Sequence, residues 1–265
     1  MTCERIASGA TVLKRMREQA ATLRVTDHRP WPVPEGRPWV MAQSWHDLLF
    51  AHWRVPAAAL RPVIHPEIPI DEFDGSAWIG ITPFRVEGSR PRLGPPPPLV
   101  SSFPECNVRT YATIDGKPGI WFFSLDAASR LAVHGARRAW RLPYFHADMA
   151  ASTRGDAVAY RTDRVSPDGP QAAFEGTYRP SGPVRHALPG SLEHFLTERY
   201  CLYTLDGRGR VHRGDIHHPP WPLQPAEAEL ERNTMTAQVG LDLAGEPLLH
   251  FARRQDVLMW RIRPI

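Results

Sequence analysis

Four side chains that could bind or react alternate along one short stretch of the chain. Glu105, Asn107, Arg109 and Tyr111 are separated by single small or apolar residues. Successive side chains of a β-strand point to opposite faces, so a strand over 105–114 places these four on one face, about 7 Å apart. An acid, an amide, a guanidinium and a phenol in this order suit the wall of a cavity for a small polar molecule. The same alternation is typical of an antiparallel strand with one solvent-exposed face, and both interpretations remain open.

In a cavity, each of these groups has a chemical role. Burial in apolar surroundings raises the pKa of a carboxyl group toward neutrality, so Glu105 is the candidate general acid or base. Arg109 is the candidate to hold a carboxylate or carbonyl oxygen, because a guanidinium can donate two parallel N–H groups. Asn107, Trp121 and Asp126 are further candidates for substrate binding. Proton abstraction beside a carbonyl group, as in isomerisation or dehydration, fits this set.

The neighbouring residues predict the order strand, strand, helix, strand. The segment 115–118, Asp-Gly-Lys-Pro, supplies a turn that reverses the first strand into a second one over 119–125. A helix follows and ends near Arg141, because the residue before a proline avoids the helical region. Arg137 or Arg138 on this helix belongs either to a solvated basic face or to a site that pairs with a substrate carboxylate.

The rest of the chain predicts an α+β protein. About ten strands with only three or four helices favour a mainly antiparallel sheet, strongly curved or closed into a cone-like barrel, with flanking helices. Residues 1–36 are expected to form an N-terminal helical extension and a linker, and 37–265 a single domain. The proline-rich run 90–98 predicts a rigid surface loop or a lid. His217 and His218 cannot both ligate one metal from a strand, because neighbouring side chains face opposite ways.

Composition argues against several classes of function. The 265 residues carry a net charge of +4, but of the 32 basic residues only Lys14 and Lys117 are lysines, and the arginines are scattered. A nucleic-acid-binding surface would cluster them with aromatic residues. The chain has no apolar run of eighteen residues and no C-x-x-C pair, which argues against a membrane span, a disulfide framework and a zinc site. We expect a bacterial cytoplasmic protein with a small-molecule ligand, no cofactor, no nucleic acid and no membrane partner; homo-oligomerisation is left open.

Taken together, five sequence blocks resemble the YqjF-like family. The blocks are W-H-D-L-L-F-A-H-W-R-V-P, F-P-E-C-N-V-R-T-Y, G-K-P-G-I-W-F-F-S-L-D-A, G-A-R-R-A-W-R-L-P-Y and H-H-P-P-W-P-L-Q-P-A-E-A-E. That family is similar, more weakly, to the acetoacetate decarboxylase superfamily, whose fold is a cone-shaped antiparallel β-barrel around a small-molecule cavity. The resemblance implies that the polar strand face lines such a cavity.

The resemblance also identifies a departure from the decarboxylases. They carry a glutamate early in a central strand, matched here by Glu105, and a G-R-E-x-x-G-x-P-K-K segment whose first lysine forms a Schiff base. Tyr144 stands in the position of that lysine. A phenol cannot form an imine, so the resemblance implies acid/base chemistry without a Schiff base, with Tyr144 donating a hydrogen bond to developing negative charge. The alternative is a non-catalytic ligand-binding or structural protein.

Overall fold

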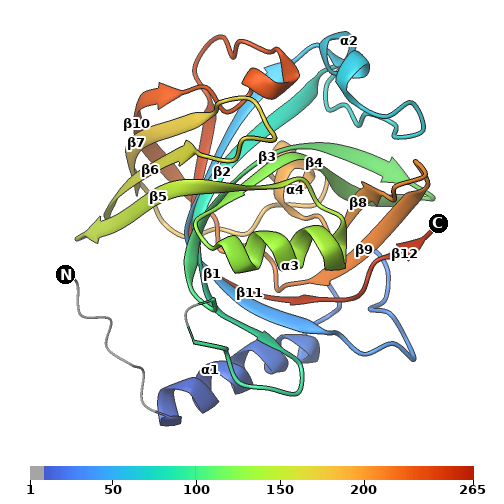
Figure 1. Cartoon of the computed structure of the whole chain (residues 1–265), viewed down its shortest axis with the longest axis vertical. Coiled ribbons are helices and arrows are strands. Elements are labelled where there is room, and N and C mark those ends of the chain that lie inside the picture. The colour runs from blue at the N-terminus through green and yellow to red at the C-terminus, as the bar shows by residue number, and fades with distance from the viewer. Residues whose placement is uncertain (1–8, 99) are drawn as a thin grey trace.

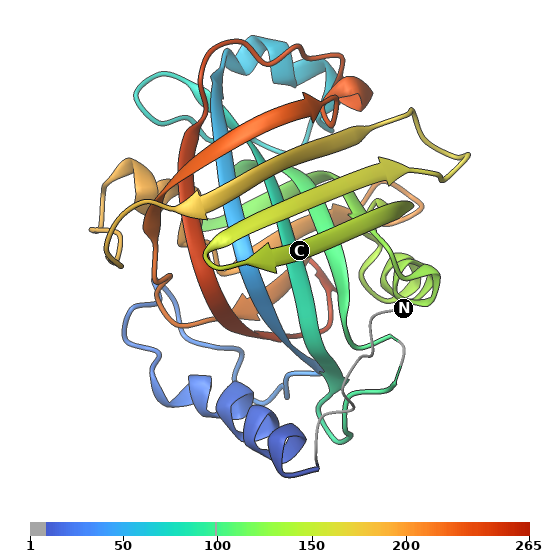
Figure 2. The ribbon, with the colours of Figure 1, turned by 90° about the vertical axis from the view of Figure 1, so that its left-hand side faces the viewer.

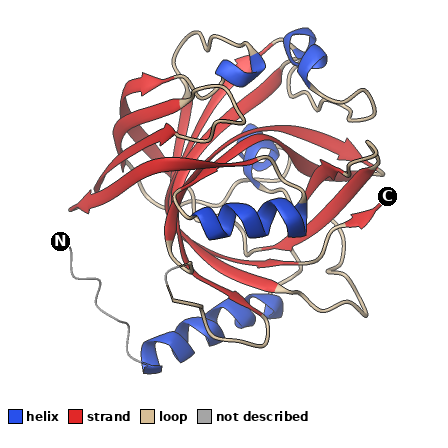
Figure 3. Cartoon of the chain, in the orientation of Figure 1, coloured by secondary structure: helices blue, strands red, loops and turns tan. Residues whose placement is uncertain are grey.

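One strongly curved, twelve-stranded sheet forms most of the structure (Figures 1 and 3). The computed structural model describes residues 9–98 and 100–265. The strands are β1 (Met41–Val55), β2 (Ala77–Pro91), β3 (Phe103–Ile114), β4 (Lys117–Ala127), β5 (Tyr144–Arg154), β6 (Ala157–Arg164), β7 (Ala173–Pro180), β8 (Cys201–Leu205), β9 (Val211–His217), β10 (Gln224–Asn233), β11 (Leu248–Met259) and β12 (Arg263–Pro264). The α-helices are α1 (Gly9–Ala21), α2 (Ala57–Leu60), α3 (Arg130–Trp140) and α4 (Leu192–Thr197), and the 3-10 helices are η1 (Thr22–Arg24), η2 (Arg61–Val63) and η3 (Ala237–Val239).

The sheet folds back on itself. Its strand order is β12-β9-β8-β4-β3-β2-β1-β11-β10-β7-β6-β5, and β9 also pairs with β11. The strands β1, β2, β3, β4, β8, β9 and β11 therefore follow one another in a ring of hydrogen-bonded neighbours. Pairing is antiparallel throughout except between β4 and β5 and between β4 and β8. The prediction of a mainly antiparallel, strongly curved sheet with few flanking helices is confirmed.

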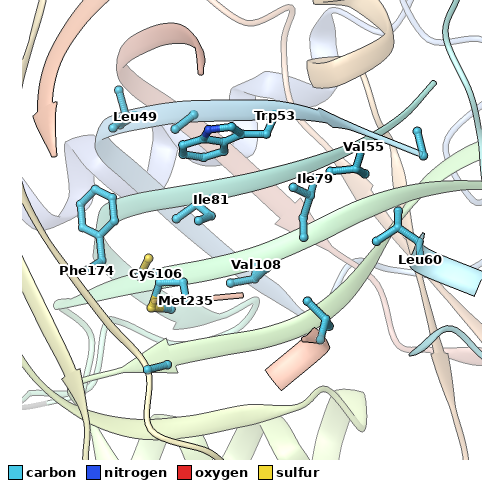
Figure 4. Close-up of a cluster of buried hydrophobic side chains, with 14 of the residues drawn as sticks. Leu49, Trp53, Val55, Leu60, Ile79, Ile81, Cys106, Val108, Phe174 and Met235 are labelled. Carbon is cyan, nitrogen blue, oxygen red and sulfur yellow. The ribbon is translucent and has the colours of Figure 1, made fainter. Parts of the chain in front are cut away.

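A hydrophobic core covers the outer face of the central strands. The strands β5, β6, β7 and β10 cross over β1, β2 and β3 in a second layer (Figure 2). Between the layers, Leu49, Ile81 and Val108 of the central strands belong to one buried cluster with Phe174 of β7 (Figure 4). Burying large apolar side chains of this kind stabilises the fold by about 1.5–3 kcal/mol each. Because this core takes the even-numbered residues of β3, the odd-numbered ones must face the inside of the ring.

Local turn and capping chemistry places the elements around β3 as the sequence predicts. Asp115 (φ 52°) and Gly116 (φ 68°) form a two-residue hairpin loop between the paired residues Ile114 and Lys117, and Asp-Gly suits such loops because both positions need positive φ. The Oγ of Ser129 accepts a hydrogen bond from the N–H of Ala132 and caps α3. The hairpin and the helix are confirmed, with the helix ending one residue before Arg141.

The N-terminal helix α1 is attached to the ends of β1 and β2. The side chain of Gln19 is fully buried and donates hydrogen bonds to the Oγ of Ser44 and the carbonyl of Gly88, each 3.2 Å long. Its Oε1 accepts a 2.7 Å bond from the Nε of Arg90. None of the described helices is both long and apolar enough to cross a membrane.

Candidate functional site

A cavity of about 460 Å³ lies inside the ring of strands, with α3 beside it. Its polar wall contains Glu105, Asn107 and Arg109 of β3 and Tyr144 at the start of β5. A cavity of this volume can hold a small organic molecule. The structure thus brings together four of the residues that the sequence suggested for one site.

Burial decides between the two interpretations of the polar strand face. Glu105 is 4 % exposed, and Asn107 and Arg109 are each 6 % exposed. A solvent-exposed face would leave these long polar side chains in water. The face lines the inside of the ring of strands instead, where polar groups removed from water need a partner in the protein or in a ligand.

Glu105 is held at both its side chain and its backbone. The Oη of Tyr144 donates a 3.1 Å hydrogen bond to Oε2 of Glu105. The Oη of Tyr160, on β6, donates a 2.8 Å bond to the backbone carbonyl of Glu105. These contacts fix the carboxyl group at the cavity wall, with Tyr144 as its hydrogen-bond donor.

The environment of Glu105 favours its neutral form. Burial raises the pKa of the carboxyl group to about 8; the hydrogen bond from Tyr144 lowers it, and the nearby charge of Asp126 raises it further. Burial and the neighbouring Glu105 also raise the pKa of Tyr144 well above 10. At neutral pH the pair is therefore mainly a carboxylic acid and a phenol, both able to donate a proton or a hydrogen bond.

Arg109 is a buried cation at the same wall without a carboxylate partner. Its guanidinium carbon lies 5.2 Å from the ring centre of Phe50, and its Nη2 donates a long, 3.4 Å bond to the carbonyl of Leu196. The Nε of Arg109 and the Oδ1 of Asn107 are buried without a hydrogen-bond partner. Within residues 9–98 and 100–265 no acidic side chain forms an ion pair with Arg109. By contrast, Arg199 at the same cavity pairs with a carboxylate at 2.8 Å.

Two further candidates, Trp121 and Asp126, lie on the opposite face of the sheet from the cavity. Val108 pairs with Ser124 while Arg109 pairs with Phe122, so β4 carries one extra residue between them. This β-bulge shifts the alternation. Leu125 faces the cavity, and Asp126 faces outward, where Oδ1 forms an ion pair with Nη2 of Arg164 at 2.7 Å. Trp121 packs against the core between the two layers.

The third candidate, Arg137, is also outside the cavity. Its Nη1 pairs with the carboxylate of Asp168 at 2.7 Å, and its Nε donates a 2.6 Å bond to the backbone carbonyl of Tyr144. A substrate carboxylate in the cavity is therefore not its partner. Arg137 instead anchors the start of β5, where Tyr144 lies.

The cavity also contains residues that the sequence patterns did not assign to a binding site. Thr197, Arg199 and His218 line it from the ends of α4 and β9. The small residues of α3 line it as well: these are Ala132, Gly135, Ala136 and Ala139. A run of small residues indicates close packing and an open cavity equally well, so the sequence offered no signal to separate the two.

The site has no amine and no metal-ligand cluster in the described part of the chain. Neither Lys14, on α1, nor Lys117, at the start of β4, lines the cavity. Among residues 9–98 and 100–265, no three side chains of His, Cys, Asp or Glu gather as a metal site would require. The cavity therefore offers carboxyl, phenol, amide and guanidinium groups, together with the hydroxyl of Thr197 and the imidazole of His218.

Comparison with solved structures defines the fold class. The acetoacetate decarboxylase from Legionella pneumophila is similar with a TM-score of 0.59 and 13 % identity, covering 90 % of this chain and 93 % of that one. The enduracididine biosynthesis enzyme MppR complexed with pyruvate gives 0.58 and 11 %, covering 90 % and 93 %. An acetoacetate decarboxylase-like enzyme from Sphingomonas wittichii RW1 gives 0.58 and 12 %, covering 91 % and 100 %. The protein has the acetoacetate decarboxylase-like fold.

Sequence comparison gives the family within that fold. Residues 42–256 match the family model DUF2071, described as "Uncharacterized conserved protein". The "Uncharacterized protein YqjF" of Bacillus subtilis (strain 168) is 48 % identical over 232 residues, which is 87 % of this chain and 94 % of that protein. The chain belongs to the DUF2071 family, and the suggested resemblance to YqjF-like proteins is confirmed.

Proposed function

We propose that the cavity binds a small carbonyl or carboxylic compound and that Glu105 exchanges a proton with it. The observation that carries this proposal is the pairing of a buried carboxyl group, whose pKa lies near 8, with the uncompensated cation of Arg109 on the same strand face. The first group is able to act as acid and base near neutral pH. The second provides a place for an anionic or carbonyl oxygen.

A proton-transfer sequence follows from these groups. The ionised fraction of Glu105, roughly one in ten at neutral pH, removes a proton from the carbon beside a carbonyl group. The C–H bond breaks, its electron pair forms the enolate double bond, and the negative charge moves to the oxygen, where Tyr144 can donate a hydrogen bond. In an isomerisation the proton on Glu105 returns to a different carbon. In a dehydration it is delivered to a hydroxyl group that leaves as water.

The structural neighbours support this substrate class without defining it. MppR, with the same fold, holds pyruvate, which is a small keto carboxylate. The sequence resemblance implies that Tyr144 stands where the decarboxylases carry their Schiff-base lysine. No lysine in the described part of the chain lines the cavity, so a Schiff-base route is not part of this proposal. That replacement also favours a second candidate, a binding protein that retains the cavity and performs no reaction.

Ligand binding and proton exchange are tested separately. Pyruvate, 4-oxopentanoate and cyclohexanone are screened by thermal shift. A ligand present at a hundred times its dissociation constant stabilises the folded protein by about 2.7 kcal/mol, which is enough to detect. Compounds that bind are then incubated in D₂O, and deuterium uptake beside the carbonyl is followed by NMR. Uptake should be lost in Glu105→Gln, and binding of the two acids should be lost in Arg109→Met. Arg179→Met, at an exposed ion pair on β7, is the control for loss of an arginine.

The outcomes separate the two candidate functions. Uptake that depends on Glu105 supports catalysis. Saturable binding without uptake supports the binding protein. If no compound shifts the melting temperature of the wild type, the proposed ligand class is wrong.

A further inference from the structure

We infer that the ligand is amphipathic, with a single carboxylate held by Arg109 and an apolar chain that extends along α3 to the opening of the cavity. This inference rests on the proposed role of the cavity as a binding site. It goes beyond that role because it sets the shape, the charge and the orientation of the ligand.

The cavity is elongated along the strands. On β2, Gly80 lies opposite Arg109, whereas Pro91 lies opposite Met41 of β1. Arg109, Pro91 and Met41 all line the cavity. Thr82 and other residues of β2 between Gly80 and Pro91 line it too. Eleven residues of strand correspond to roughly 35 Å along its curved path, far more than a three- or four-carbon acid needs. Space remains for a chain beyond the head group.

The inner end of the cavity is its polar end. Arg109 has an unpartnered Nε there, and Asn107 beside it has an unpartnered Oδ1. A buried guanidinium without a counter-charge is strongly unfavourable, and a ligand carboxylate would compensate it with up to two parallel hydrogen bonds. Glu105 lies four residues back along β3, about 13 Å away at the backbone. The reacting part of the ligand therefore lies some bonds away from its carboxylate.

The α3 side of the cavity is apolar and open. Leu131 is 71 % exposed although it lines the cavity, so the opening lies beside it. Gly135 is one turn further along α3, and a Cβ atom built there would meet nothing within 4 Å. Ala139 follows at the next turn. Leu131, Gly135 and Ala139 form an exposed stripe at the mouth of the cavity, which provides an apolar surface for a hydrocarbon chain.

A second anionic group on the ligand is not required. Arg90 also lines the cavity, near Pro91, but its donors are already used. Its Nε donates to Gln19, its Nη2 donates to the carbonyl of Met16 at 3.0 Å, and its guanidinium stacks on Trp39 at 5.1 Å. The contrast with Arg109 indicates one charged end and one apolar end.

The test measures binding alone, by titration calorimetry with butanoate, hexanoate and octanoate, and with octanamide as the uncharged analogue. Each added CH₂ group that enters the apolar part should tighten binding about fourfold. Octanoate should bind at least tenfold more tightly than octanamide to the wild type. In Arg109→Met this preference should disappear while the dependence of octanamide binding on chain length remains.

Variants on α3 test where the chain lies. Gly135→Phe, and independently Ala139→Phe, should weaken octanoate binding at least tenfold and leave butanoate binding within about twofold, because only the longer chain reaches that stripe. His134→Phe, exposed on the same helix and not part of the cavity wall, is the matched control. Circular dichroism verifies that each variant is folded.

Failure of this inference is distinguishable from failure of the proposed function. If affinity does not increase from butanoate to octanoate, or if the α3 variants weaken all chain lengths equally, the amphipathic ligand is wrong. Deuterium uptake that depends on Glu105 would then still support the proton chemistry. If octanoate binds as expected and no uptake occurs, the binding inference stands and the catalytic proposal does not.

Discussion

Replacing Glu105 by glutamine should change how the stability of the protein depends on pH. The folded-state pKa of Glu105 is about 8, against an ordinary value of 4.5. Between these values the folded protein holds one proton more than the unfolded chain, so the free energy of unfolding falls by about 1.4 kcal/mol per pH unit. From pH 5 to pH 9, the titration of this single group lowers the free energy of unfolding by roughly 4 kcal/mol. The contribution of Glu105 to stability is fully present below the pKa of the unfolded state and is lost as pH rises through the pKa of the folded state.

Glutamine keeps nearly the same shape and has no titrating proton, so the variant should lack this loss. The free energies of unfolding of wild type and Glu105→Gln are measured by urea denaturation at each pH unit from 5 to 9, and their difference is plotted. The difference should shift by roughly 4 kcal/mol in favour of the variant across this range. Glu231→Gln, at an exposed position of β10, is the control for loss of a surface carboxyl group. Parallel curves for wild type and Glu105→Gln would refute the assignment of Glu105 as a buried neutral acid.

Four further outcomes follow from the structure. The affinity for hexanoate should fall as pH rises through about 8, because ionised Glu105 repels the carboxylate of the ligand. Calorimetry at pH 6.5 and 9.5 checks this, and the affinity of Glu105→Gln for hexanoate should not change between these pH values. Asp126→Asn should cost about 3–5 kcal/mol in urea unfolding, since Arg164 would stay buried and uncompensated, and a hydrophobic replacement of both residues should recover much of it. Gly119→Ala should destabilise by about 1–3 kcal/mol because its Cβ would approach a tyrosine ring of β8 to 2.6 Å, whereas Gly135→Ala should raise the melting temperature, since alanine favours a helix by up to about 1 kcal/mol.

Short-range chemistry in the sequence determined the elements around the site. The Asp115-Gly116 pair specified the hairpin, because both positions adopt positive φ. The alternation from Glu105 to Arg109 specified that these side chains share one face, and β3 extends over all of them. The count of short strands and few helices specified a curved, mainly antiparallel sheet. The hairpin and the shared strand face rest on backbone geometry within a few residues, and the count of strands rests on such local patterns repeated along the chain.

The tertiary structure alone decided what covers each face. The polar face of β3 is buried because distant elements enclose it: Leu196, whose carbonyl accepts the bond from Arg109, is 87 residues further along the chain. The extra residue near Phe123 turned Asp126 outward to Arg164, and nothing in the local alternation indicated where that bulge would fall. Whether a strand face meets water, a core or a cavity depends on contacts between segments far apart in the sequence. That is why the sequence could name Glu105 and Arg109 as candidates, and only the fold could show them buried at one wall.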